Sequence, residues 1–330
     1  MHEHPELRFG DRLIESLAVE PSRTIFATME APWNLVLPRL SFAPEHIVTV
    51  TTMERADIDR AEEALPDFDV IIGIGGGSCV DFAKYIAWKR GARLILIPSI
   101  ASVDACVTHL VAVREGGRVR NVGNARAERL LIDFALISAA MPRLNRAGAA
   151  DIFSIHTASF DWMLGYRKNN EQYSERIAAE CAEAVRELER SADDINAVNN
   201  NGIRKLIELF EVENDLCLEL GNYRPEEGSE HFFAYNAEHL TGKHFIHGEL
   251  VSLGILLMSR LQNNEPECVK SLLDKLGVLY RPQDIGLEID ELRQILLTLA
   301  DYCRKENLPH TIINETEITP AVVSNMTSDL

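Results

Sequence analysis

The chain has 330 residues, of which 46% are apolar, and a formal net charge of −18. Basic surfaces bind nucleic acids and anionic membranes, so this acidic balance argues against both as partners and favours an enzyme that acts on a small-molecule substrate. Because one domain usually holds roughly 100 to 200 residues, we expect two domains.

Neither end of the sequence nor its interior suggests a membrane protein or a secreted protein. No apolar run approaches the roughly 20 residues that span a bilayer, and the first residues lack the apolar core of a signal peptide. The six cysteines are scattered without a C-x-x-C pair, as expected of reduced thiols that pack as small apolar side chains. We therefore expect a cytoplasmic protein.

The first 141 residues alternate short β-branched strands with helical stretches. Strands are predicted over 24–28, 46–52, 69–74 and 93–97, and a helix over 79–90 precedes the last of them. Alternation of this kind is typical of a parallel sheet with helices on both faces. The sequence thus predicts an α/β domain over residues 1–141.

Residues 67–78 read DFDVIIGIGGGS, so a buried strand runs directly into Gly75, Gly76, Gly77 and the hydroxyl of Ser78. Glycines let backbone N–H groups approach a phosphate closely, and the helix that follows points its positive N-terminal end at the same place. A tight turn without a ligand is the alternative, but ligands of open α/β sheets collect at such strand–loop–helix units. We predict a phosphate-bearing cofactor here.

This loop is not the usual dinucleotide fingerprint G-x-G-x-x-G. Ser78 occupies the sixth position, and two predicted strands already precede the loop, whereas the fingerprint follows a first strand. The sequence therefore indicates a different nucleotide-binding fold.

Long helical patterns dominate from Pro142 to the end of the chain. We predict an all-α domain over residues 142–330 and expect a site in the cleft between the two domains. The helices are predicted over 147–164, 171–198, 201–219, 229–242, 247–262, 265–276 and 289–305.

Three residues of the second half form a candidate set of metal ligands. Asp151 lies in AGAADIF at a helix start, His231 in GSEHFFAYNAEH and His247 in FIHGELVSLG. Each has an ordinary explanation, as an early-helix acid or as a surface or core histidine. Small residues precede Asp151 and follow His247, however, and one carboxylate with two imidazoles leaves open the coordination positions that a catalytic Zn²⁺ or Fe²⁺ requires. We interpret the set as a candidate catalytic metal site.

Five segments occur in an order that resembles one enzyme superfamily. They are GIGGGSCVDFAKYIA, IPSIASVDACVT, LLIDFALISAAMPRLNRAGAADIFSIHTASFDWMLG, GSEHFFAYNAEH and IHGELVSLGIL. Together they resemble the iron-containing alcohol dehydrogenases, glycerol dehydrogenases and dehydroquinate synthases, with the nearest resemblance to sn-glycerol-1-phosphate dehydrogenases. The resemblance covers about residues 67 to 262 and implies a dehydroquinate synthase-like fold.

The resemblance also implies roles for particular residues. A divalent metal is expected on Asp151, His231 and His247, with Zn²⁺ favoured and Fe²⁺ or Ni²⁺ as alternatives. NAD(H) or NADP(H) is expected on the first domain, with Asp104 as an acid beside the substrate, and a homo-oligomer is expected because such enzymes commonly form one. The residues that match cofactor positions are Gly75, Gly76, Gly77 and Ser78 at the pyrophosphate, Asp81 in support of that loop, and Ser99, Ser102 and Thr108 along the cofactor.

The function implied is a metal-dependent NAD(P)(H) oxidoreductase on a small polyol, aldehyde or polyol phosphate, with glycerol-1-phosphate as the nearest model. The alternative is a sugar-phosphate cyclase of the dehydroquinate synthase type, which SVDACVTHLV disfavours because it lacks the Lys-rich phosphate segment of those enzymes. A third reading is a non-catalytic nucleotide-binding member. Tyr235 stands where the glycerol-1-phosphate and dehydroquinate branches have a second histidine, so the substrate stays open.

Overall fold

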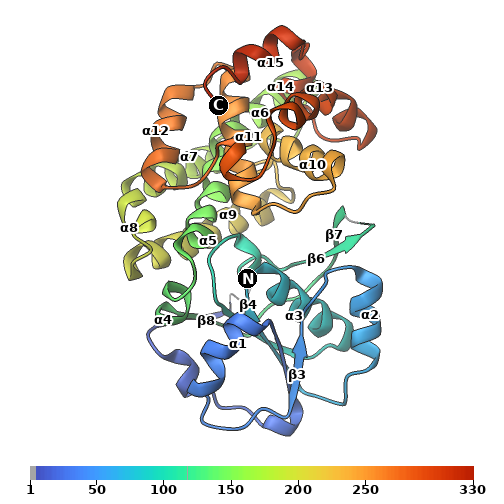
Figure 1. Ribbon diagram of the computed structural model, residues 1–330, viewed down its shortest axis with the longest axis vertical. Coiled ribbons are helices and arrows are strands. Elements are labelled where there is room, and N and C mark those ends of the chain that lie inside the picture. The colour runs from blue at the N-terminus through green and yellow to red at the C-terminus, as the bar shows by residue number, and fades with distance from the viewer. Residues whose placement is uncertain (1–4, 117) are drawn as a thin grey trace. The chain divides into compact units, whose positions relative to one another are not determined.

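The computed structural model describes residues 5–116 and 118–330 (Figure 1). The chain divides into two compact units, Met1–Asn145 and Arg146–Leu330. The boundary predicted from the sequence, between residues 141 and 142, lies at the start of helix α5 (Pro142–Ala147), and the division falls inside that short helix.

The first unit is an α/β unit, and its sheet has six strands in the order β1-β8-β5-β4-β2-β3, every neighbouring pair being parallel. Strands β6 and β7 form a separate antiparallel pair. The strands are β1 (Glu6–Gly10), β2 (Thr24–Thr28), β3 (His46–Thr49), β4 (Val70–Gly75), β5 (Arg93–Pro98), β6 (Leu110–Glu115), β7 (Arg118–Asn124) and β8 (Arg129–Asp133). The helices are α1 (Glu30–Val36), α2 (Arg55–Glu63), α3 (Gly77–Arg90) and α4 (Phe134–Ser138).

The predicted parallel sheet is confirmed, and two of its strands were missed in the sequence. Strands β1 and β8 pair with each other at one edge of the sheet, with Leu7 opposite Leu130. Their short, mixed sequences ELRFG and RLLID carry little periodicity, so only pairing between distant segments defines them. The glycine loop therefore follows the fourth strand of the chain, not the third.

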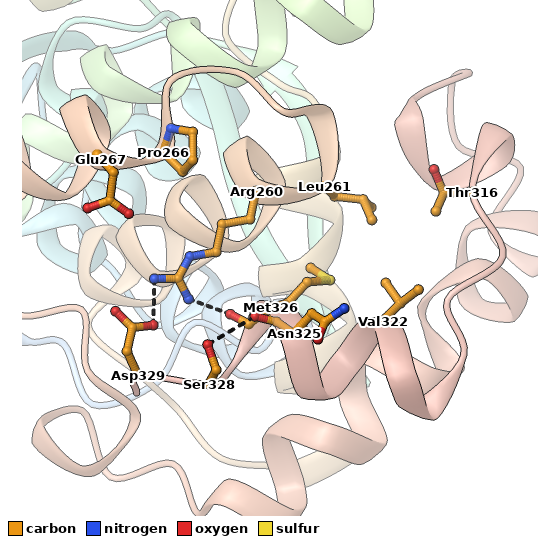
Figure 2. Close-up of a pocket in the computed structure, with 10 residues that line it drawn as sticks. All are labelled: Arg260, Leu261, Pro266, Glu267, Thr316, Val322, Asn325, Met326, Ser328 and Asp329. Carbon is orange, nitrogen blue, oxygen red and sulfur yellow. Dashed lines mark hydrogen bonds and ion pairs between the residues drawn. The ribbon is translucent and has the colours of Figure 1, made fainter.

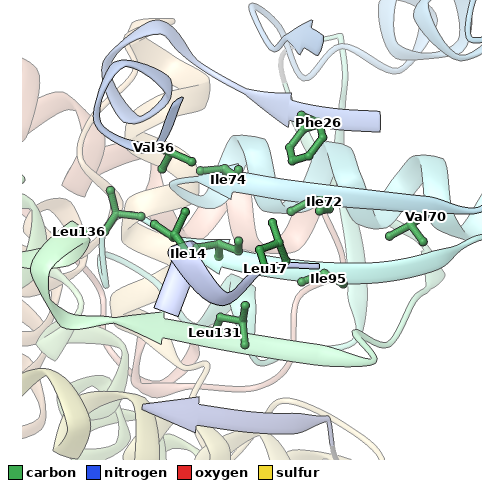
Figure 3. Close-up of a cluster of buried hydrophobic side chains, with 11 residues drawn as sticks. Ile14, Leu17, Phe26, Val36, Val70, Ile72, Ile74, Ile95, Leu131 and Leu136 are labelled. Carbon is green, nitrogen blue, oxygen red and sulfur yellow. The ribbon is translucent and has the colours of Figure 1, made fainter. Parts of the chain in front are cut away.

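The sheet is covered on both faces. Alternate residues such as Ile72 and Ile74 of β4 and Ile95 of β5 lie in one apolar cluster with Val36 of α1 and Leu136 of α4 (Figure 3). The cluster consists of Ile14, Leu17, Phe26, Val36, Val70, Ile72, Ile74, Ile95, Ile97, Leu131 and Leu136.

Helix α3 packs against the opposite face of the sheet. A Cβ placed on Gly73 would lie 2.8 Å from the Cβ of Ala83 in this helix, so the helix approaches the strand too closely for any other residue. This close contact holds the N-terminus of α3 at the carboxyl end of β4.

The second unit is helical throughout its described elements, as predicted. Its helices are α5 (Pro142–Ala147), α6 (Ala149–Asn169), α7 (Glu175–Arg190), α8 (Ala192–Asn196), α9 (Asn200–Leu220), α10 (Ser229–Thr241), α11 (His247–Gln262), α12 (Pro266–Leu276), α13 (Ile289–Lys305), α14 (Ile312–Glu315) and α15 (Pro320–Met326). The single helix predicted over 171–198 is wrong in detail: Ser174 caps the start of α7, and the chain breaks at Ser191 before α8.

Two global features bear on the expectations from composition. Among the described residues, no helix combines the length and apolar character needed to cross a bilayer. The six cysteines, which all lie in the described residues, form no disulfide there, and five of them are buried, as expected of small apolar side chains.

Candidate functional site

Asp151, His231 and His247 come together at the starts of three helices of the second unit. Asp151 lies in the first turn of α6, His231 in the first turn of α10, and His247 is the first residue of α11. Each offers one ligand atom, and these atoms all lie within 4.8 Å of one another. Asp151 and His231 are buried, whereas the side chain of His247 is 40% exposed, so solvent reaches the group from one side.

Glycines permit this convergence by letting the helices approach one another closely. A Cβ on Gly248 would lie 1.9 Å from the carbonyl oxygen of Ala147, and one on Gly254 would lie 2.6 Å from the carbonyl oxygen of Glu230. Both obstacles are backbone atoms that cannot rotate away. The glycine after His247 is therefore required by packing of the α11 start against Ala147, the last residue of α5.

A buried carboxylate supports His231 directly. Glu230 is fully buried, and its Oε1 lies 3.0 Å from Nδ1 of His231. The same carboxylate accepts hydrogen bonds from the backbone N–H of Gly228 at 2.6 Å and from the hydroxyl of Thr157 at 2.8 Å. The imidazole is thus held by a carboxylate that is itself fixed from two other directions.

A second buried carboxylate holds the start of α10. Asp161 accepts hydrogen bonds from the backbone N–H and hydroxyl of Ser229, at 2.8 and 2.6 Å, and from the backbone N–H of Ile312 at 2.8 Å. Burial and the negative charge of Glu230 raise the pKa of Asp161 to about 6. Asp161 of α6 therefore links this helix to α14 and to α10, the helix that carries His231.

The electrostatic surroundings of His231 favour a cation. Burial by itself lowers the pKa of His231, but the hydrogen bond to Glu230 and its negative charge outweigh this effect, and nearby Glu226 and Glu227 add to it. The result is a pKa raised to about 9. An imidazole surrounded by carboxylates binds a positive charge well, whether a proton or a metal ion.

The donor set fits a divalent metal. One carboxylate and two imidazoles are the ligand types of catalytic zinc and of non-haem iron sites, which keep positions open for substrate. The residues present therefore suit the ion that the family resemblance implies.

Tyr235 lies one turn after His231 on α10, with its ring centroid 6.1 Å from that of His231. Its hydroxyl donates to Oε1 of Glu227 at 2.5 Å. Burial, with the charge and hydrogen bond of Glu227, raises the pKa of Tyr235 well above its usual value, so the hydroxyl stays neutral. The position where the related branches carry a histidine thus holds a neutral phenol paired with a carboxylate.

In the first unit the glycine loop joins β4 to α3, as the sequence predicts. Gly75 has a φ of +150°, and a Cβ there would lie 2.5 Å from Sγ of Cys79. A Cβ on Gly76 would lie 2.7 Å from Cδ1 of Ile100. Helix α3 begins at Gly77, and Ser78 is exposed beside it, so backbone N–H groups and a hydroxyl gather at the helix N-terminus.

The other predicted cofactor residues lie along the segment that follows β5. The backbone N–H of Ser99 donates to the carbonyl of Gly75 at 2.9 Å, which ties this segment to the glycine loop. Ser102 and Asp104 are partly exposed, and Asp104 begins a short 3-10 turn that ends at Cys106. The hydroxyl of Thr108 accepts a hydrogen bond from the backbone N–H of Leu110 at 3.4 Å.

Asp81 contacts a buried lysine in its own helix. Its Oδ1 lies 2.7 Å from Nζ of Lys84, which also donates to the carbonyl oxygens of Ala105 and Leu110 at 2.8 and 2.6 Å and of Thr108 at 3.3 Å. Burial raises the pKa of Asp81 despite the opposing charge of Lys84. Asp81 and Lys84 together fasten α3 to the segment after β5, which is how Asp81 contributes to this region.

Sequence reasoning did not assign roles to Lys84, Asp161 or Glu230. The i, i+3 spacing of Asp81 and Lys84 on a predicted helix was a usable signal for an ion pair. Asp161 and Glu230 stood within quoted motifs. Asp161 accepts from Ser229, 68 residues away in the chain, and Glu230 accepts from Thr157, 73 residues away, besides contacting the adjacent His231. No periodic pattern predicts these contacts.

A pocket of about 500 Å³ lies elsewhere in the second unit, beside the end of α11 (Figure 2). Figure 2 shows Arg260 pointing toward Asp329, with Nη2 at 2.7 Å from Oδ1 of that carboxylate. Arg260 is 13 residues after His247 on the same helix, which places the pocket roughly 20 Å along the axis from the metal-type ligands. This pocket is therefore separate from the candidate metal site.

Comparison with known proteins identifies the family of the chain. The family model for iron-containing alcohol dehydrogenase matches residues 16–141. The glycerol-1-phosphate dehydrogenase of Aeropyrum pernix is 30% identical over 275 residues, which cover 83% of this chain and 77% of that protein. The chain belongs to the iron-containing alcohol dehydrogenase family.

A second relative supports this membership, and solved structures share the fold. The glycerol-1-phosphate dehydrogenase of Hyperthermus butylicus is 29% identical over 87% of this chain and 83% of its own length. Among solved structures, a probable glycerol dehydrogenase from Sinorhizobium meliloti has a TM-score of 0.73 at 21% identity, with 98% of this chain and 96% of that chain covered. The glycerol dehydrogenase of Schizosaccharomyces pombe also has a TM-score of 0.73, at 17% identity, with 98% and 88% covered. The predicted fold class is confirmed by these similarities.

Proposed function

We propose that this chain is a metal-dependent NAD(P)(H) oxidoreductase that acts on a small polyol, an aldehyde or a polyol phosphate. The observation that carries the proposal is the convergence of Asp151, His231 and His247 at three helix starts, with ligand atoms within 4.8 Å of one another. The curated relatives named above are NAD(P)+-dependent glycerol-1-phosphate dehydrogenases, which makes glycerol-1-phosphate the first substrate to test.

In the second unit, Asp151, His231 and His247 would hold the divalent metal, for which the family resemblance favours Zn²⁺, with Fe²⁺ or Ni²⁺ as alternatives. A divalent metal in such a site supplies a Lewis acid for a carbonyl or alcohol oxygen, while a nicotinamide supplies or accepts the hydride. The residues of the chain orient this chemistry: Glu230 fixes the ring of His231, and the exposed side of His247 leaves room for a substrate.

In the first unit, Gly75, Gly76, Gly77 and Ser78 would bind the pyrophosphate at the N-terminus of α3. Ser99, Ser102 and Thr108 would line the rest of the cofactor, and Asp104 would act as the acid beside the substrate. Asp81 contributes through Lys84, which holds the segment containing Thr108 in place.

The experiment combines metal analysis with a substrate screen. We expect each of three substitutions to remove most of the bound metal: Asp151→Ala, His231→Ala and His247→Ala. Each variant should also lose the change in absorbance at 340 nm with dihydroxyacetone phosphate or glycerol-1-phosphate. His239→Ala is the matched control, because His239 is an exposed histidine of α10 and should keep both. Full metal retention in all three ligand variants would refute the site, and phosphate release without net cofactor turnover would favour the cyclase instead.

We also propose that the protein works in the cytoplasm as a homo-oligomer. Its cysteines, mostly buried and outside any disulfide in the described residues, suit a reducing compartment, and the oligomer rests on family resemblance. Light scattering coupled to size-exclusion chromatography tests the second part, and a monomer across the working concentration range would refute it.

A further inference from the structure

Glu230 is a buried carboxylate that directly precedes the proposed metal ligand His231. It is not itself one of the three proposed ligands. Its Oε1 lies 3.0 Å from Nδ1 of His231, and the side chain is fully buried. A neutral imidazole that donates from Nδ1 keeps its lone pair on Nε2, because one ring nitrogen carries the proton and the other accepts. The carboxylate therefore leaves Nε2, on the side of the ring away from Glu230, as the nitrogen that can bind a metal.

The carboxylate is held so firmly that it can impose an orientation. Gly228 donates its backbone N–H to Oε1 at 2.6 Å, and Thr157 of α6 donates its hydroxyl to Oε2 at 2.8 Å. A Cβ on Gly228 would lie 2.9 Å from Oε2 of Glu230, so only glycine leaves space for this arrangement. On the other side, the absence of a side chain on Gly254 lets the backbone of Glu230 lie directly against α11.

We propose that Glu230 is a positioning residue of the metal site, which fixes His231 in the tautomer with the proton on Nδ1 and the lone pair on Nε2. Carboxylates that accept from the second nitrogen of a metal-bound histidine orient the ring and increase its basicity, and their loss commonly weakens metal binding about 10- to 100-fold. The inference rests on the proposed metal site. It adds Glu230 as the group that decides which nitrogen of His231 binds the metal.

The first measurement needs no substitution. Histidine labelled with ¹⁵N in the Zn²⁺-loaded protein reports the protonated nitrogen of each ring, and the His231 signal is identified by its loss in His231→Asn. The expected result is a proton on Nδ1 and zinc on Nε2. A proton on Nε2 would overturn the proposal, while a wild-type protein that binds no zinc would overturn both the metal site and this inference.

The second measurement is zinc affinity by competition with a chromophoric chelator. Glu230→Met removes the acceptor at nearly constant volume and should weaken binding about 10- to 100-fold, whereas Glu230→Gln keeps an acceptor oxygen and should recover most of the loss. Glu227→Gln is the charge control, because Glu227 acts on His231 through its charge and bonds to Tyr235 instead. The positioning role would be contradicted if folded Glu230→Met bound zinc with wild-type affinity. It would also be contradicted if Glu227→Gln lost as much zinc affinity as Glu230→Met.

Discussion

Ser78 is the residue at which the glycine loop can be tested without disturbing the fold. Gly75 and Gly76 are kept free of side chains by the protein itself, because a Cβ at either position would meet Cys79 or Ile100. Substitutions of these glycines therefore mix a packing defect with any effect on the cofactor. Ser78 is exposed in the first turn of α3 and carries no such restriction.

At this residue scale, Ser78→Glu should weaken NADH binding at least about tenfold, an effect of roughly 1.4 kcal/mol. A carboxylate in the first turn of a helix stabilises the helix by about 0.3 to 1 kcal/mol, so the variant should remain folded while its charge repels a phosphate. Isothermal titration with NADH measures the affinity.

Ser78→Gln is the neutral control of similar size and should stay within a few-fold of the wild type. Equal NADH affinities for the Glu and Gln variants would mean that no phosphate binds at the N-terminus of α3.

At the scale of elements, the metal-type ligands depend on how closely the starts of α6, α10 and α11 approach one another. Sequence periodicity predicted α11 and α13 at their observed bounds, because both helices have strong apolar patterns that need no partner to be recognised. The close contact of the α11 start with Ala147 is not a periodic property, and the small residues before Asp151 and after His247 were the signs of it in the sequence.

Gly248→Ala should disturb the α11 start, since its Cβ would lie 1.9 Å from the carbonyl oxygen of Ala147. We expect a loss of about 1 to 3 kcal/mol or more in the free energy of unfolding, together with weaker zinc binding, because His247 is the adjacent residue. Urea unfolding and chelator competition measure the two effects.

Gly221→Ala is the matched control in the same unit, with a φ of +81° and open space around its Cβ. It should cost about 1 to 2 kcal/mol through backbone strain alone and leave zinc affinity unchanged. Wild-type zinc binding in Gly248→Ala would show that the packing of α11 does not position His247.

At the scale of the whole molecule, the proposed cofactor and metal residues belong to different units. The glycine loop and the segment 99–108 are in the first unit, and all three metal-type ligands are in the second. We therefore expect zinc to stabilise its binding region in the second unit and NADH to stabilise its binding region in the first.

Zinc should slow hydrogen exchange in the first turns of α6, α10 and α11, and NADH should slow it at residues 73–80 and 99–108. A ligand at 100 times its dissociation constant stabilises the native state by about 2.7 kcal/mol, which is enough to register in exchange rates. Mass spectrometry of peptides after exchange, with EDTA-treated protein as the reference, checks both effects. Unchanged exchange at all three helix starts on zinc addition would contradict the assignment of the metal to the second unit.

The sequence alone determined the fold class, most of the long helices and the choice of Asp151, His231 and His247 as candidate ligands. The fold class and most of the long helices were predicted correctly because apolar periodicity and glycine runs are local properties, whereas the choice of the three ligands stays a prediction. Only the tertiary structure decided that β1 pairs with β8, that Lys84 joins α3 to the segment after β5, and that Glu230 holds His231. The first two features join groups far apart in the chain. The third joins adjacent residues, but Thr157, 73 residues away, helps to hold the Glu230 carboxylate. Such contacts are chosen by packing and burial, which no short stretch of sequence records.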